Sequence, residues 1–237
     1  MSDDGIGFTH FPYNSDDIET TGLVNLVIFD VVVDGQAKIL SFLKVDGQQR
    51  VNKWLAESLG RKLEKEKQAA AMMLTTPGKP FVYQGEELGY YGKKDGGDEY
   101  VRTPMLWDKA GKDCAKKGVN NKVDNAMLTS SISVEAQDAD ANSLLNVYKT
   151  WSRLRNIYPA LAEGTMTDAS LGGGNSIAGW YMTAGSQKLL VIHNTATSAK
   201  TVTVKDNTSR AVGLLGTATI DHDVLTLGPN SSVVFKL

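Results

Sequence analysis

Hydrophobic positions in the first two thirds of this chain alternate between strand-like and helix-like patterns. Two apolar runs, 23–33 and 39–45, are rich in β-branched residues and each ends at an Asp-Gly pair, so they predict buried strands. Residues 51–74 repeat apolar side chains at helical spacing, with Glu and Lys on the solvent face, which predicts an amphipathic helix. A third strand is predicted at 80–84, where β-branched and aromatic residues follow a Pro-Gly turn.

The remaining pattern predicts a loop, a helix and a set of short strands. Residues 85–140 are polar and read as a long loop, and a second amphipathic helix is expected at 142–157, with Asn142 as its cap and Pro159 closing it. Short β-branched runs separated by turn residues then predict an antiparallel β domain. These runs are 177–182, 188–193, 201–204, 211–215, 224–227 and 232–237.

The predicted fold class is therefore α/β followed by all-β. We expect an N-terminal arm at 1–22, an α/β region at 23–160 and a β-sandwich domain at 161–237. Within the sandwich, Trp180 and Tyr181 alternate on one strand, so one should face the core and the other solvent. His193 is expected to be a structural residue of a strand.

Composition excludes several function classes. With 25 basic and 27 acidic residues, the chain has no field that would attract nucleic acid or an anionic membrane. No apolar run approaches the roughly 20 residues of a membrane span, and the acidic start is not a signal peptide. Cys114 has no second cysteine to pair with, and three histidines suggest neither a metal site nor a Cys-His centre. No cofactor is expected.

One segment has the composition of a sugar-binding site. Flat rings stack on pyranose faces, while carboxylates and a guanidinium bind hydroxyl groups. The candidate substrate-binding residues are Tyr83, Glu86, Glu87, Arg102 and Trp107. A structural alternative is equally open at this point, in which the two carboxylates are a solvated strand end and the aromatic rings pack the loop.

Residues 80–108 also resemble, in order, the eighth barrel strand and the following loop of the α-amylase family (glycoside hydrolase family 13). An Arg-Thr-Pro-Met sequence from Arg102 with a nearby Trp107 is typical of amylases and oligosaccharide glucosidases in that family. The resemblance implies a partial (β/α)8 barrel, beginning at a seventh strand within 42–50, followed by the family's C-terminal β-sandwich. A complete barrel alone takes roughly 250 residues.

The same resemblance leaves the catalytic chemistry open. Retaining glycosidases use two carboxyl groups about 5–5.5 Å apart. In this family the nucleophile and the general acid follow the fourth and fifth strands, and neither motif is found in this sequence. A third carboxylate follows the seventh strand, where ungapped alignment places Val45, Asp46 and Gly47. Asp46 takes that role only after a one-residue shift, so Asp46 and Glu86 are the candidate catalytic residues.

The resemblance implies a starch- or α-glucan-related glycoside hydrolase, of which this chain carries part of the sugar-binding rim. Two alternatives are a non-catalytic carbohydrate-binding or assembly module, and an enzyme rebuilt from carboxylates that include Asp98 and Glu99. The expected ligand is a weakly bound maltooligosaccharide. Open faces of a partial barrel predict a homodimer, or a partner that supplies the missing strands. Localisation is not fixed by the sequence, although the parent family is often extracellular.

Overall fold

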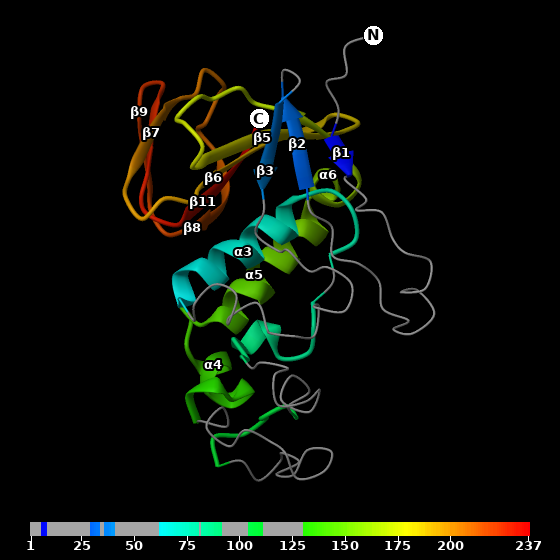
Figure 1. The fold of residues 1–237 in the computed structure, drawn as a ribbon, viewed down its shortest axis with the longest axis vertical. Helices are drawn as coiled ribbons and strands as arrows, with labels where there is room; N and C mark the ends of the chain where they lie inside the picture. The colour runs from blue at the N-terminus through cyan, green and yellow to red at the C-terminus, as the bar shows by residue number, and fades with distance from the viewer. Residues whose placement is uncertain are drawn as a thin grey trace. The chain divides into compact units, whose positions relative to one another are not determined.

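The computed structural model describes residues 62–80, 82–91, 104–110 and 130–237, together with the backbone of three strands nearer the N-terminus (Figure 1). The chain divides into two compact units. One comprises residues 1–66 and 81–146, and the other comprises residues 67–80 and 147–237. Within the described residues, no helix is long and apolar enough to cross a membrane.

Helices dominate the middle of the chain and strands its last third. The helices are α3 (Leu63–Thr75), η3 (Glu86–Leu88), η7 (Ser130–Ile132), α4 (Val134–Ala139), α5 (Leu144–Ile157) and α6 (Pro159–Glu163). The first three strands are β1 (Ile6–Phe8), β2 (Phe29–Val33) and β3 (Gln36–Leu40). The others are β4 (Thr165–Asp168), β5 (Ile177–Ala184), β6 (Gln187–Asn194), β7 (Lys200–Thr203), β8 (Ala211–Leu215), β9 (Ala218–Asp221), β10 (Val224–Leu227) and β11 (Ser231–Lys236).

The N-terminal strands form an antiparallel sheet in the order β1-β2-β3. Strand β2 lies inside the predicted 23–33 run and pairs with β3, with Val33 opposite Gln36. Only two residues separate these ends, and so short a connection requires antiparallel neighbours. Strand β3 overlaps the predicted 39–45 run, whose last five residues lie outside the described part of the chain, as do residues 23–28.

The strand predicted at 80–84 is wrong for its described residues. The Glu86 amide donates to the Tyr83 carbonyl at 2.9 Å, so the chain turns directly after Val82 and Tyr83. A β-branched and aromatic run becomes a strand only where a neighbouring strand takes up its backbone hydrogen bonds. The predicted loop at 85–140 contains short helical segments, η3, η7 and α4.

Both predicted amphipathic helices are present, with different ends. Helix α3 covers the second half of the predicted 51–74 helix, whose first half lies outside the described residues. Helix α5 matches the predicted 142–157 helix, but the cap is Ser143, whose Oγ accepts from the Asn146 amide at 3.1 Å. The prediction of Asn142 as cap is therefore wrong by one residue. Pro159 follows the end of α5, as predicted, and opens α6.

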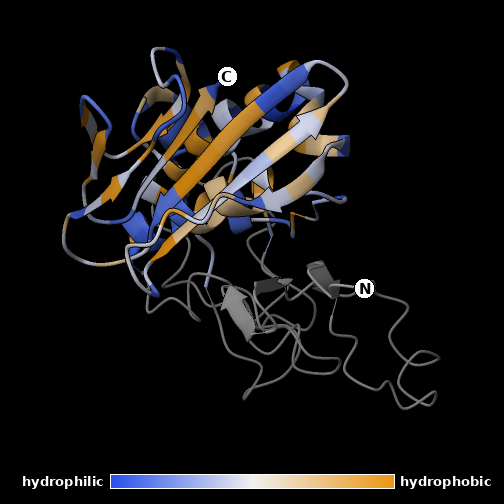
Figure 2. Ribbon diagram, turned by 90° about the horizontal axis from the view of Figure 1, so that it is seen from above, coloured by the Kyte–Doolittle hydropathy of each residue, from blue (hydrophilic) through white to orange (hydrophobic). Residues whose placement is uncertain are grey.

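The last third of the chain forms two antiparallel sheets. The five-stranded sheet has the order β4-β5-β6-β11-β8, and the three-stranded sheet has the order β7-β10-β9. The six predicted strands are confirmed, whereas the short, polar strands β4 and β9 were not predicted because neither contains a continuous apolar run. Apolar side chains from both sheets form one buried core. They are Leu190, Ile192, Val202, Val204, Leu225, Leu227, Val233 and Phe235. The long strands of this domain are largely hydrophobic in Figure 2.

The second face of the five-stranded sheet is buried as well. A Cβ added at Gly213 of β8 would meet the Leu154 side chain of α5 at 2.7 Å, which places that helix directly against the sheet. Trp180 is only 1% exposed and lies 4.9 Å from the ring of His193 on this face, while Tyr181 packs against the core between the sheets. The expectation that one of these two rings faces solvent is therefore wrong, because helices cover the outer face.

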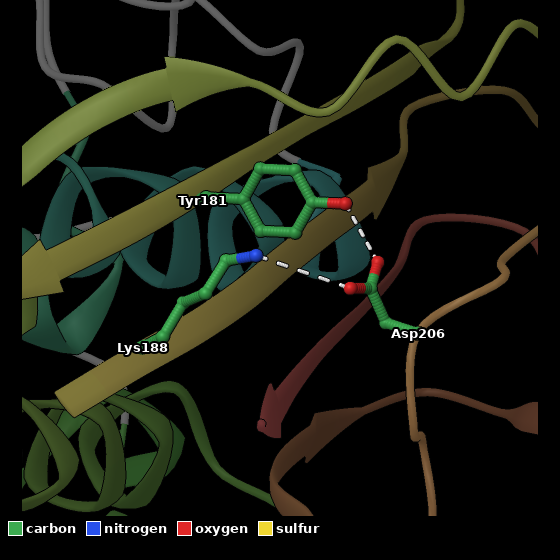
Figure 3. A network of polar contacts seen from close by, with 3 residues as sticks. All are labelled: Tyr181, Lys188 and Asp206. Atoms are coloured by element: carbon green, nitrogen blue, oxygen red, sulfur yellow. Dashed lines mark hydrogen bonds and ion pairs between the residues drawn. The ribbon is translucent and has the colours of Figure 1, made fainter. Parts of the chain in front are cut away.

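Tyr181 also ties β5 to the segment that follows β7 (Figure 3). Its hydroxyl donates to Asp206 Oδ2 at 2.6 Å, and the Lys188 Nζ lies 3.9 Å from Asp206 Oδ1 and 4.0 Å from the Tyr181 ring centroid. Burial, followed by the hydrogen bond and the charge of Asp206, raises the pKa of Tyr181 to about 12. The hydroxyl therefore stays protonated and acts as a structural donor.

His193 joins α3 to the sheet through two hydroxyl groups. Thr75 Oγ1 donates to the Ala71 carbonyl at 2.8 Å, so it accepts from His193 Nε2, 3.2 Å away. His193 Nδ1 is then the acceptor for the Ser232 hydroxyl at 2.7 Å. Burial lowers the pKa of His193 to about 3, and the expectation of a structural role agrees with this buried, neutral arrangement.

Arg155 of α5 forms hydrogen bonds with the C-terminal end of α3. Its guanidinium donates to the carbonyls of Leu74 at 3.0 Å and Thr76 at 2.7 Å, and also to the Gly78 carbonyl. A fourth bond, at 2.7 Å, goes to Leu161 in α6. The last carbonyls of a helix have no partner within the helix, so a buried cation at this end stabilises the whole turn.

We expect His193→Gln to remove a pH-dependent part of the stability. Because the pKa is about 3 in the folded chain and 6.5 ordinarily, the unfolded chain binds a proton between these values that the folded chain excludes. The resulting loss in the free energy of unfolding is negligible above pH 6.5 and reaches about 2 kcal/mol at pH 5. Urea unfolding at about pH 7.5 and 5 should show the unaltered chain losing about 2 kcal/mol more than the variant.

The control is His222→Gln, because the His222 side chain is 93% exposed. This variant should keep the pH dependence of the unaltered chain. If the free energy of unfolding fell equally with pH in His193→Gln and in the unaltered chain, the neutral, buried state of His193 would be contradicted.

Candidate functional site

Two glycines shape the turn that carries the paired carboxylates. Gly85 and Gly89 flank η3 with φ of +86° and +75°, values that side chains with a Cβ rarely adopt. The Leu88 and Tyr90 amides both donate to the Gly85 carbonyl, at 3.1 and 3.0 Å. The turn is therefore closed by its own backbone, with Glu86 and Glu87 in its first half.

Tyr90 connects this turn to a second segment of the chain. Its side chain is 1% exposed, and its hydroxyl donates to the Pro104 carbonyl at 3.2 Å and accepts from the Leu106 amide at 2.7 Å. Tyr90 packs in a small core with Leu88 and Leu145. Partly buried residues around this core are Tyr83, Tyr91, Met105, Ile132 and Val134.

Helix α4 fixes the same two segments from its N-terminal end. The Val134 and Glu135 amides donate to the carbonyls of Leu106 and Trp107, both at 2.9 Å. The Gln137 amide group donates to the Leu88 carbonyl at 2.8 Å. The turn at 85–89, the segment at 104–107 and α4 therefore form one hydrogen-bonded assembly, which we call the rim.

The rim contains three of the predicted substrate-binding residues, and a fourth, Tyr83, lies directly before it. Tyr83, Glu86 and Glu87 are half-buried, and Trp107 is 54% exposed on the neighbouring segment. Arg102 and the catalytic candidate Asp46 lie outside the described residues. The contacts of Tyr90 and α4 place the two segments side by side, and the binding roles themselves stay predictions.

One oxygen of Glu87 is buried without a hydrogen bond. Among the residues that the structure describes, Glu87 Oε2 has no hydrogen-bond partner. An unpaired carboxylate oxygen in such a position carries a desolvation cost that a hydroxyl donor would remove. No group of three or more acidic, histidine or cysteine side chains suited to a metal ion occurs among the described residues.

Glu66 is a buried acid that the sequence pattern did not reveal. It belongs to a run of charged residues assigned to the solvent face of the helix, yet Glu66 is 5% and Lys67 8% exposed. A Cβ added at Gly89 would lie 3.0 Å from Glu66 Oε2 and 3.5 Å from Leu144. This burial raises the pKa of Glu66 to about 7. The carboxyl group therefore packs against Gly89, at the end of the turn that carries Glu86 and Glu87.

Comparison with known families gives two matches along the chain. Residues 29–164 match the alpha amylase catalytic domain, and residues 177–234 match the C-terminal domain of alpha-amylase SusG. The chain belongs to the alpha-amylase family. The predicted architecture, a partial barrel segment followed by an antiparallel β-sandwich, is that of the matched family regions.

Relatives in this family are longer than the chain. Alpha-amylase SusG of Bacteroides thetaiotaomicron is 43% identical over 192 residues, which cover 77% of this chain and 27% of SusG. Alpha-amylase 3 of Dictyoglomus thermophilum is 28% identical, over 83% of this chain and 38% of the relative. The chain thus spans well under half the length of these family members.

Solved structures of the alpha-amylase family have the same fold. Eubacterium rectale Amy13B is 27% identical, with a TM-score of 0.59 over 73% of this chain and 34% of the other. The alpha-amylase from H. orenii has a TM-score of 0.65 at 24% identity, over 78% of this chain and 38% of the other. At that identity the likeness supports the fold alone.

We expect Gly85→Ala to disrupt the rim by two separate effects. The left-handed backbone disfavours any Cβ, and an added Cβ would also meet the Tyr90 ring, with Cγ at 2.7 Å. Gly174→Ala is the matched control, because Gly174 has φ of +78° and nothing within 4 Å of its Cβ position. The control should cost about 1 kcal/mol and Gly85→Ala about 1–3 kcal/mol more, measured by urea unfolding. Equal costs would contradict the packing of Tyr90 against Gly85.

Proposed function

We propose that this chain provides the late barrel and the C-terminal domain of an alpha-amylase-type glycoside hydrolase that acts on starch-related α-glucans. The observation that carries the proposal is the rim, where an exposed Trp107 on a firmly held backbone lies beside a turn with two carboxylates. Similarity to alpha-amylase SusG supports an α-glucan as the ligand.

The chemistry of the rim suits a neutral, polyhydroxylated chain. The apolar face of a glucose ring stacks on an indole, and Trp107 presents such a surface. Hydroxyl groups need acceptors, and the half-buried Glu86 and Glu87 supply carboxylates on the neighbouring turn. Together these groups give a binding surface that needs no metal ion or cofactor.

Cleavage of the glycosidic bond needs further groups. By resemblance to the family, the nucleophile and general acid follow earlier strands than the region represented in this chain. The proposal therefore assigns binding and positioning to Tyr83, Glu86, Glu87 and Trp107. Asp46 is a candidate for the third carboxylate of the family.

A second candidate function is a non-catalytic carbohydrate-binding or assembly module. It uses the same exposed Trp107 to bind sugar and takes no part in catalysis. Incubation of the chain with soluble starch, with product anomers followed by NMR, separates these two candidates from an enzyme rebuilt from the remaining carboxylates. Net retention of configuration, abolished by Glu86→Gln, would indicate the rebuilt enzyme, and no turnover would exclude it.

We expect maltoheptaose to bind in the millimolar range, about −4 kcal/mol, when measured by isothermal titration. Trp107→Ala should weaken binding by about 3- to 10-fold, because an aromatic stacking contact is lost. Leu214→Ala is the control, since Leu214 is 51% exposed on the sandwich and should leave the affinity unchanged. No heat with the unaltered chain, or equal affinity of the Trp107 variant, would refute binding at the rim.

We further propose that the chain self-associates as a homodimer unless a partner supplies the rest of the barrel. Val82 of the first unit is 41% exposed, and open apolar faces and strand edges of a partial barrel favour an interface. Two-fold pairing is the commonest closed arrangement. Sedimentation equilibrium should show twice the 25.6 kDa chain mass at high concentration. A single species at the chain mass, with no binding of a hydrophobic dye, would refute the dimer.

A further inference from the structure

We propose that Tyr90 is the positioning residue that preorganises Trp107 for stacking on a sugar ring. The inference deepens the proposed function and rests on it for the identity of the ligand. Tyr90 itself is 1% exposed, so it acts through the backbone that it holds and not through contact with the ligand.

The hydroxyl of Tyr90 satisfies two backbone groups on one segment. It donates to the Pro104 carbonyl at 3.2 Å and accepts from the Leu106 amide at 2.7 Å, so it spans the residues on either side of Met105. Leu106 is 3% exposed, and its amide would lack water if this acceptor were removed. One phenolic oxygen therefore holds one side of the segment immediately before Trp107.

Helix α4 fixes the same segment on its other side. The Val134 amide donates to the Leu106 carbonyl and the Glu135 amide to the Trp107 carbonyl, each at 2.9 Å. Leu106 is thus bonded through both its amide and its carbonyl group. An indole that is 54% exposed on such a backbone loses little conformational freedom when a ligand stacks on it, and this favours binding.

The ring of Tyr90 connects the segment at 104–107 to the turn at 85–89, which carries Glu86 and Glu87. A Cβ at Gly85 would overlap the ring, which shows that the turn packs directly against it. The turn and the Trp107 segment therefore keep a fixed relation through one side chain. Phenylalanine at position 90 would keep this packing and remove the hydroxyl that makes the two hydrogen bonds, which makes Tyr90→Phe the informative variant.

The experiment uses the full chain labelled with 5-fluorotryptophan and 19F NMR, with the Trp107 resonance assigned by Trp107→Phe. In Tyr90→Phe, the Trp107 resonance should shift and broaden, while the resonances of buried Trp151 and Trp180 stay in place. Titration with maltoheptaose should show affinity reduced by about 3- to 10-fold, as expected for the loss of hydrogen bonds that order the platform.

Tyr181→Phe is the matched control, because it removes a tyrosine hydroxyl bond to Asp206 in the second unit. It should leave the Trp107 resonance and the affinity unchanged. An unchanged Trp107 resonance and affinity in Tyr90→Phe would overturn the inference, and so would equal changes in all tryptophan resonances, since these indicate general loss of structure. If the unaltered chain binds no maltoheptaose, the proposed function fails, and the Trp107 resonance still decides whether Tyr90 orders it.

Discussion

Strand β6 imposes the main constraint on the second unit, because both of its faces are buried. Leu190 and Ile192 face the core between the sheets, and His193 faces the helix layer. A strand buried on both faces needs a cover on each side, and the three-stranded sheet supplies only one. Helices α3 and α5 supply the other. There, Thr75 and Ser232 form hydrogen bonds with both ring nitrogens of His193. These bonds fix the register of the helix layer on the sheet.

Much of the fold follows from local pattern, and the exceptions share a physical cause. Alternating strands such as β5 and β10, and the stripe of α5, are determined by side chains close together in sequence. Burial of Trp180 and Glu66 was not predicted, because the groups that cover them come from distant parts of the chain. The run at 80–84 has strand-forming residues, yet the chain turns at Tyr83, which local pattern does not reveal.

For the candidate site, the residue types in the segment predicted its chemistry, but the sequence did not predict how the side chains are held in place. Aromatic and carboxylate residues in one segment indicated sugar chemistry, and resemblance to the alpha-amylase family indicated which sugar class. Local pattern does not predict the role of Tyr90, since one tyrosine in a polar loop has no periodicity. Its importance lies in the hydrogen bonds to the backbone of Pro104 and Leu106. Gln137 and the N-terminal amides of α4 were missed for the same reason.

The residues that match the SusG C-terminal domain do not coincide with a compact unit of this chain, and the contacts of Arg155 show why. The SusG C-terminal domain match begins at residue 177, yet the compact unit that contains it also includes residues 67–80 and 147–176. A fragment cut to the matched residues would lose the covering helices and expose the outer face of β6. A fragment beginning at 147 would keep Arg155 but remove the carbonyls of Leu74, Thr76 and Gly78, which accept three of its four hydrogen bonds. Dissection, limited proteolysis and domain grafting therefore need to treat the sandwich and these two helical segments as one piece.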